Sequence, residues 1–372
     1  MINSFSYKVR FNNSMHRAFA EELNSKVDHY FKSNHISRYA NTSMKLKGAF
    51  MFLLLSVPYI ILLTIPLPFY QMVLLSTLSG IGMVGVGFNI CHDACHNAYS
   101  QNPKINRLLG YGFNLLGINA YLWKIKHNLS HHTYTNIYHK DEDLLESDGV
   151  RLSPEAPYKK IYRFQHIYYF LFYPLYSFIW VFVYDFQVFF RFNGNGSSDP
   201  MKKHPLKEVI VFIASKLIYF LFALVLPFYL MEAKWWEILI CYLSMHAIAG
   251  VIMACVVKLG HIVDNVSHAI PDEDGIIQNS WMVHELEVSS NFSIDSPFVS
   301  WFSGGLNFQI EHHLFPRTCS VHYPKISPII LEITKKYGFP YHINKTMVSG
   351  LLSHYKTLKR LGSPNSTQVI IH

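Results

Sequence analysis

The sequence predicts an all-α membrane protein with four transmembrane helices and a cytoplasmic helical cap that carries a histidine-rich metal site. Of its 372 residues, 50% are hydrophobic and only 15% are charged, whereas soluble domains average about 25% charged residues. No Asp, Glu, Lys or Arg occurs between Gly48 and Lys104 except Asp93. About 20 apolar residues cross a bilayer, so the apolar stretch before His92 is long enough for two spans.

The predicted elements follow in chain order. Residues 1–47 form a cytoplasmic amphipathic region, with a helix expected at about 15–31. This region begins without the apolar core of a cleaved signal peptide, so we expect no such peptide. Residues 48–316 form the membrane domain, and residues 317–372 form a cytoplasmic C-terminal region. Within the membrane domain, we expect spans at about 48–68, 70–91, 209–231 and 238–257, with the first two joined by a proline-rich turn.

A fifth apolar run, at 164–184, determines the topology. If the histidine clusters on either side of it form one site, an even number of crossings separates them, and spans 209–231 and 238–257 already supply two. The run contains Pro174, many aromatic residues and flanking charges at Arg163 and Asp185. We therefore predict that it lies along the interface or dips into the membrane without crossing, which leaves both termini and the site cytoplasmic. Lys216, inside the third span, is expected to extend towards the nearer surface.

The distribution of charged residues and cysteines indicates which binding partners and which cysteine chemistry to expect. The formal net charge is +8, but the basic residues are dispersed beside the apolar runs, as in cytoplasmic loops of membrane proteins. We therefore expect a lipid bilayer as partner and no nucleic acid. The five cysteines form no CxxC pair, so neither a disulfide framework nor thiolate ligation is expected.

Three histidine clusters adjoin the predicted spans. Histidines three or four residues apart on a helix share a face and can share a metal ion. One tetrahedral zinc uses four ligands, so a set of this size indicates two ions. Imidazole ligands suit iron, copper, zinc or nickel alike. The candidate ligands are His92, His96, His127, His131, His132, His261, Gln309, His312 and His313.

Carboxylates beside these clusters are candidates for orienting the imidazoles through hydrogen bonds to their N–H groups. They are Asp93 in the first cluster, Glu311 in the third, and the acidic run 141–143. An equally good interpretation of each is a solvated carboxylate. His246 lies in mid-span and is interpreted as a core histidine.

The motifs resemble those of the membrane fatty acid desaturase family. His92-Asp93-x-x-His96, Trp123-x-x-x-His127-Asn128-x-x-His131-His132 and Gln309-Ile310-Glu311-His312-His313 are similar to its three histidine boxes. The similarity extends from the first span to about Pro316. Gln309 in place of a histidine resembles the front-end branch, such as linoleoyl-CoA or delta-6 type desaturases. His261 matches the family's histidine after the last span.

This resemblance implies two iron ions, dioxygen as co-substrate, and a fatty acyl chain on CoA or a lipid as substrate. The predicted reaction is insertion of a cis double bond, on the carboxyl side of an existing one. No His-Pro-Gly-Gly haem motif of a fused cytochrome b5 domain occurs in the sequence. We therefore expect the electrons to come from an external donor, a ferredoxin or a cytochrome b5-type protein.

Three alternatives remain at this point. A lipid hydroxylase or ketolase of the same di-iron family would share the boxes and differ only in product. A membrane zinc protease is disfavoured because no HExxH motif occurs. The third is a non-catalytic membrane protein that binds metal or haem. Haem carriers place histidine pairs within spans, whereas these clusters lie just outside them.

Overall fold

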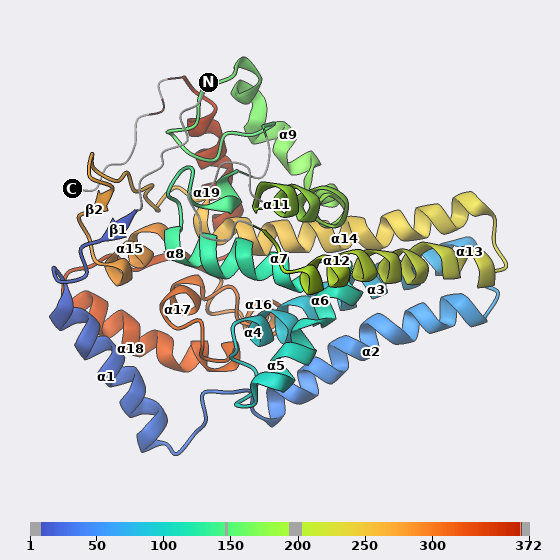
Figure 1. Cartoon of the computed structure of the whole chain (residues 1–372), viewed down its shortest axis with the longest axis horizontal. Helices are drawn as coiled ribbons and strands as arrows, with labels where there is room; N and C mark the ends of the chain where they lie inside the picture. The colour runs from blue at the N-terminus through green and yellow to red at the C-terminus, as the bar shows by residue number, and fades with distance from the viewer. Residues whose placement is uncertain (1–8, 146–147, 193–202, 365, 367–372) are drawn as a thin grey trace.

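The computed structural model describes residues 9–145, 148–192, 203–364 and 366, and it is predominantly helical (Figure 1). Long helices extend together to one side of the molecule, and shorter helices form a cap on the other side. Residues 1–8, 365 and 367–372 of the two predicted terminal regions lie outside the described residues, as do 146–147 and 193–202.

Five segments of the described chain have the length and hydropathy of membrane spans. Their bounds are Thr42–Thr64, Phe69–Cys95, Tyr173–Phe192, Leu206–Leu230 and Trp235–His261. Four of them overlap the predicted spans, with each boundary displaced by a few residues. Their helical elements are α2 (Thr42–Thr64), α3 (Phe69–Val86), the π-helical turn η1 (Gly87–Cys91), α4 (His92–Cys95), α12 (Leu206–Phe220), the π-helical turn η7 (Leu221–Val225), α13 (Leu226–Leu230) and α14 (Trp235–His261).

Small residues allow the long helices to pack closely. A side chain at Gly82 of α3 would collide with the backbone of Leu55 in α2, and one at Gly80 would collide with the carbonyl of Met245 in α14. Such contacts are typical of membrane helices, where lipid is as apolar as the helix surfaces and close packing drives association. In contrast, the outer face of α12 exposes Ile213 and Leu217, as expected of a surface that meets lipid.

The fifth segment is a broken helix with both flanks in the cap. Near its start, Gln165 donates to the carbonyl of Leu358 at 2.8 Å, and near its end Arg191 pairs with Glu142. In between, a side chain at Gly250 of α14 would meet the carbonyls of Tyr173 and Pro174. The elements are η4 (Lys160–Phe164), α9 (Gln165–Leu171), η5 (Tyr173–Leu175), α10 (Tyr176–Ile179), the π-helical turn η6 (Trp180–Tyr184) and α11 (Asp185–Phe192).

Lys216 does not extend to the surface, contrary to the prediction. Its ammonium group is buried and lies 2.7 Å from the Asp185 carboxylate and from the carbonyls of Gly117 and Val181. A lysine surrounded by apolar segments is stable only with such partners. The ion pair therefore connects α12 to the broken segment, a contact that hydropathy does not reveal.

The cap is built around the histidine-bearing ends of the spans. The helix expected at 15–31 is confirmed as α1 (Arg17–Ser33), which buries Phe19 and Leu23 in a core shared with α18. Two short parallel strand pairs, β1 with β2 and β3 with β4, connect distant segments. Before the broken segment the cap contains α5 (Pro103–Gly110), α6 (Gly112–Leu115), α7 (Ala120–Lys124), the π-helical turn η2 (Ile125–His131), α8 (His132–Tyr134) and η3 (Glu142–Leu144).

The remaining cap elements complete the enclosure of the histidines. They are β1 (Arg10–Phe11), β2 (Ile276–Ile277), α15 (Trp281–Val288), β3 (Ser290–Phe292), α16 (Pro297–Phe302), α17 (Gln309–Leu314), η8 (Ser320–His322), α18 (Tyr323–Lys336), β4 (His342–Asn344) and α19 (Met347–Leu361). Helix α17 carries the third histidine cluster and is fully buried.

Candidate metal centre

The structure brings all nine predicted ligand residues into one buried region. The first cluster begins where α3 continues through η1 into α4, the second lies on η2 and α8, and the third lies on α17. His261 is the last residue of α14. Segments about 220 residues apart in sequence thus meet at one place.

The imidazoles form two groups and a link between them. In each group, one ligand atom per residue lies within 4.8 Å of the others. The first group contains His92, His96, His127 and His312, the second contains His131, His261 and His313, and the linking group contains His132, His312 and His313. Two groups joined in this way are an arrangement suited to two neighbouring metal ions.

The second cluster does not present its three histidines on one α-helical face, as its spacing suggested. Because η2 is π-helical, His127 meets His132, five residues later, with their Nε2 atoms 3.1 Å apart. His131 points instead towards His261, with ring centroids 4.8 Å apart. The π-helical turn therefore divides the cluster between the two groups, and such turns occur often at functional sites.

The unpartnered nitrogens of the site fit a bound cation. Among the described residues, the Nε2 atoms of His96 and His313 are buried and have no hydrogen-bond partner. His132 Nε2 lies 3.1 Å from His127 Nε2 and 2.9 Å from His312 Nε2. A single proton cannot satisfy three converging imidazole nitrogens, whereas a metal ion can accept a lone pair from each. The donor set thus suits imidazole-binding metals such as iron.

Partners of the opposite ring nitrogens orient several of these imidazoles. His131 Nδ1 donates to Asp141, with both carboxylate oxygens at 3.1 Å. His261 Nδ1 donates to the carbonyl of Val288 at 3.1 Å. Such bonds leave Nε2 free to bind a metal and fix the direction of the ring.

Glu285 is a neighbour of the site that the sequence interpretation missed. Its Oε2 lies 2.8 Å from His313 Nδ1, and both side chains are fully buried. Thr135 Oγ1 lies 3.2 Å from the other carboxylate oxygen and 3.3 Å from His313 Nδ1. The available signal was a glutamate within the short run 281–288, which also contains His284 and Glu287. Nothing in its spacing connects it to a ligand almost 30 residues later.

The two predicted orienting carboxylates differ in their contacts. Asp93 Oδ1 lies 3.3 Å from His92 Nδ1, and its Oδ2 accepts from the backbone and hydroxyl of Ser320. Glu311 accepts from Asn291 and Tyr341 rather than from an imidazole. In the described structure Glu311 therefore fixes α17, and it acts on the adjacent histidines only through the backbone.

Gln309 lies beside the second group. Its Oε1 is 3.2 Å from His261 Nε2, and its Nε2 donates to the carbonyl of Leu306 at 2.7 Å. A side chain at Gly260 would collide with Gln309. The glutamine oxygen is thus held towards the same nitrogen of His261 that the Val288 hydrogen bond leaves free.

Burial controls the protonation of most of the imidazoles. Burial is the largest cause that holds the pKa values of five imidazoles well below the usual range, and neighbouring imidazoles add to it. The five are His96, His127, His132, His312 and His313. These rings are neutral at pH 7 and can bind a metal. Burial also opposes the charge on His131, but the carboxylates of Asp141 and Asp143 raise its pKa to about 9. A metal ion that binds His131 Nε2 therefore has to displace a proton from it.

An apolar cavity of about 80 Å³ adjoins the imidazoles on the membrane side. We call it the metal-side cavity. Trp123 lies over His127 with ring centroids 4.3 Å apart. The other residues that line it include Met83, Phe88, Leu116, Trp180 and Leu306. The site therefore faces a narrow hydrocarbon-like space rather than open water.

Comparison with known proteins agrees with this arrangement. The family model described as fatty acid desaturase matches residues 67–345. An sn-1 linoleoyl-lipid 6-desaturase of Synechocystis sp. is 34% identical over 349 residues, which cover 93% of this chain and 96% of that protein. A second sn-1 linoleoyl-lipid 6-desaturase, from Arthrospira platensis, is 30% identical over 378 residues, with 99% of each chain covered.

A third relative shows the same relationship. An acyl-lipid (8-3)-desaturase of Physcomitrium patens is 30% identical over 344 residues, which cover 91% of this chain and 71% of that protein. The region that the family model matches contains all nine candidate ligands and four of the five candidate spans in full. The chain belongs to the fatty acid desaturase family.

Proposed function

We propose that the protein is a membrane desaturase that inserts a cis double bond into the acyl chain of a lipid at a two-iron site. The observation that carries this proposal is the pair of linked imidazole groups at the end of an apolar cavity. The names of the cyanobacterial relatives favour a linoleoyl chain on a lipid, with the new bond on the carboxyl side of an existing one. Gln309 in the third box supports the same front-end assignment.

The residues assigned to the two ions follow the two imidazole groups. His92, His96, His127 and His312 would hold one ion, and His131, His261 and His313 would hold the other, with Gln309 beside it. His132 lies between the groups. When bound, two irons would supply dioxygen activation, which gives the oxidising power that side chains lack.

The protein's own residues position the acyl chain and protect the reaction. Trp123, Phe88 and Leu306 line the metal-side cavity, so the methylene groups that react are enclosed without water. Asp141, Val288 and Glu285 hold the imidazoles from behind. Overall, the acyl chain loses two hydrogens, an external donor protein supplies two electrons, and dioxygen with two further protons leaves as two waters.

We propose four membrane crossings, with the histidine site and both termini on the cytoplasmic side. Both flanks of the fifth segment contact the cap: Gln165 contacts Leu358, and Arg191 contacts Glu142. The loops at the opposite end, 65–68 and 231–234, contain one basic residue, Lys234. Because Lys and Arg concentrate in cytoplasmic loops, the cap side is the cytoplasmic side.

Product analysis tests the reaction. The full chain is expressed in a host that makes no polyunsaturated lipid, linoleate is supplied, and lipid fatty acids are analysed by mass spectrometry. We expect a product that has lost two hydrogens, with the new bond between the carboxyl group and the existing bonds. A product that has gained one oxygen would instead establish a hydroxylase. Purified protein should contain about two irons per chain, and haem absorbance or zinc as the functional metal would contradict the proposal.

A further inference from the structure

Two consecutive residues after α8, Thr135 and Asn136, lie at the centre of the hydrogen bonds around the second imidazole group. That group contains His131, His261 and His313, which come from three segments distant in sequence. Both residues are buried, with Thr135 0% and Asn136 1% exposed. We call them the Thr135–Asn136 pair. The ligand sets assigned to the two ions do not include either of them.

The side chain of Asn136 connects the segments around His261. Its Nδ2 lies 3.0 Å from the carbonyl oxygen of His261, 3.2 Å from that of Ser267 and 3.5 Å from that of Val288. Three carbonyl oxygens near one atom identify it as the amide nitrogen, and its two N–H groups can donate to the two nearer ones. The Val288 carbonyl also accepts from His261 Nδ1 at 3.1 Å. The amide group therefore lies between the backbone of His261 and the carbonyl that orients its ring.

The backbone of Asn136 supports His131. Its N–H donates to Asp141 Oδ2 at 2.9 Å, and the same carboxylate accepts from His131 Nδ1. Asn136 has a φ of 56°, in the left-handed region, which asparagine adopts more readily than most other residues except glycine. In this conformation the backbone N–H and the side-chain amide of one residue reach two different ligand segments.

The hydroxyl of Thr135 reaches the third ligand. Its Oγ1 lies 2.7 Å from the carbonyl oxygen of His131, 3.2 Å from Glu285 Oε1 and 3.3 Å from His313 Nδ1. A hydroxyl has one proton and donates to one acceptor at a time, and the short contact with the His131 carbonyl is the best of these. The oxygen can then accept from the N–H of His313. The two residues together thus contact all three ligand segments of the second group.

The first imidazole group has different supports. His92 Nδ1 lies 3.3 Å from Asp93, and His312 Nδ1 lies 3.3 Å from the hydroxyl of Tyr323. Among the described residues, neither member of the Thr135–Asn136 pair forms a hydrogen bond with an imidazole of the first group. A change in the pair should therefore disturb one ion position and leave the other intact.

We propose that the Thr135–Asn136 pair positions the imidazoles of the second group as a unit and thereby sets the affinity of one of the two ion positions. This inference rests on the proposed two-iron function. The pair acts through His131, His261 and His313, so its members are positioning residues. Rings that are already held in the correct direction bind an ion more tightly, and loss of such supports typically lowers metal affinity by about 10–100-fold.

Anaerobic titration of the full-length apoprotein with ferrous iron tests the proposal. T135V keeps the shape of the side chain and removes the hydroxyl, whereas T135S retains the hydroxyl. N136G removes the amide and still permits the left-handed backbone conformation. We expect T135V and N136G to weaken one of two binding steps by about 10–100-fold and to leave the other step unchanged. T135S should restore most of the wild-type affinity.

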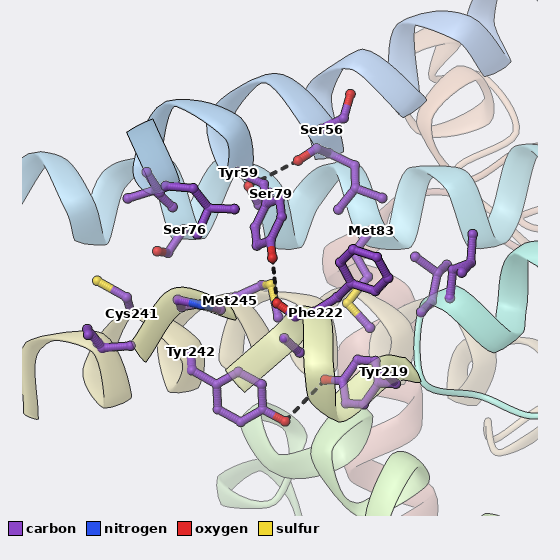
Figure 2. Close-up of a pocket in the computed structure, with 18 of the residues that line it drawn as sticks. Ser56, Tyr59, Ser76, Ser79, Met83, Tyr219, Phe222, Cys241, Tyr242 and Met245 are labelled. Carbon is purple, nitrogen blue, oxygen red and sulfur yellow. Dashed lines mark hydrogen bonds between the residues drawn. The ribbon is translucent and has the colours of Figure 1, made fainter. Parts of the chain in front are cut away.

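Two control variants make matched changes away from the imidazoles. His35 is exposed and also has a positive φ, of 52°, so H35G is the control for N136G. Tyr59 donates to the carbonyl of Phe222 across a cavity of about 310 Å³ between the long helices (Figure 2). No histidine lines this cavity, so Y59F is the control for loss of a hydroxyl. Both controls should retain two wild-type binding steps.

Ligand variants identify the binding step that the pair affects. H96A removes a donor from the first group, and H261A removes one from the second. When T135V is added to H96A, the binding step that remains should weaken. When T135V is added to H261A, the remaining step should not change, because the position that the pair supports is already lost.

Equal weakening of both steps by T135V and N136G, or unchanged affinity in both variants, would overturn the proposal. Thermal unfolding of each apoprotein shows whether it folds, and if N136G does not, the comparison of T135V with T135S decides. The two proposals fail in different ways. If the wild-type protein binds two ferrous ions but forms no desaturated product, the desaturase function is wrong and the titrations still test the pair. If it forms the product while T135V and N136G bind both ions normally, only the role of the pair is wrong.

Discussion

Two buried polar regions of this protein both contain histidine, and they differ in how their nitrogens are satisfied. In the membrane, His246 has a partner at each nitrogen, Ser177 Oγ at 3.0 Å and Tyr219 at 2.5 Å. In the metal centre, the Nε2 atoms of His96 and His313 have no hydrogen-bond partner among the residues that the structure describes. Burying an unpaired polar group costs free energy. A fully paired histidine is therefore structural, whereas unpaired nitrogens that converge indicate a ligand site.

The largest effect is expected at His312, which belongs to both the first group and the link. His312→Ala removes a shared donor and should abolish desaturation and lower the iron content from about two ions per chain. Iron analysis and product analysis of the same preparation measure both. His246→Gln is the matched control, since it should retain iron. Equal loss of iron in the two variants would contradict the assignment of one region as structural and the other as metal-binding.

A large effect on stability is expected at the buried ion pair in the membrane. Lys216→Met leaves the Asp185 carboxylate without its cationic partner, and breaking a buried pair costs about 3–5 kcal/mol. Thermal unfolding in detergent should show a clear loss of stability. In the double variant K216M/D185N most of the stability should return, because no buried charge remains. Loss without recovery in the double variant would indicate that packing, rather than charge, makes the contact important.

An intermediate effect is expected at Glu285, which lies behind His313. Groups in this position typically contribute 10–100-fold to metal affinity or activity. Glu285→Gln keeps the size of the side chain and should lower iron affinity by about that factor, while the fold is retained. Iron titration of the apoprotein gives the affinity. Glu287→Gln is a suitable control, because Glu287 pairs with Asn279 away from the imidazoles. A normal iron affinity in Glu285→Gln would remove Glu285 from the site.

The smallest effect is expected in the paired histidine region. Tyr219→Phe removes the hydroxyl that contacts His246, and one buried hydrogen bond contributes about 1 kcal/mol, with up to about 3 kcal/mol if His246 is left unpaired. The melting temperature should fall slightly, and the iron content should remain unchanged. A loss of iron would show that the two regions are coupled and would contradict the distinction between a structural and a metal-binding region.

The sequence by itself predicted the membrane class, the four long helices and the clustering of nine ligand candidates. These features depend on local composition and spacing, since apolar length decides span formation and residue type decides ligand chemistry. The fatty acid desaturase family followed from the same motifs, and the comparisons confirm it. Ligand assignment, the four crossings and the cytoplasmic orientation remain proposals.

The tertiary structure decided how the clusters divide and what supports them. The π-helical turn η2 paired His127 with His132 and turned His131 towards His261, although spacing alone favoured a single face. Glu285 reached His313, and Lys216 reached Asp185 rather than the surface. These contacts join segments that are distant in sequence. They form because a buried charge or imidazole takes the partner that packing brings near, and a local pattern contains no information about that partner.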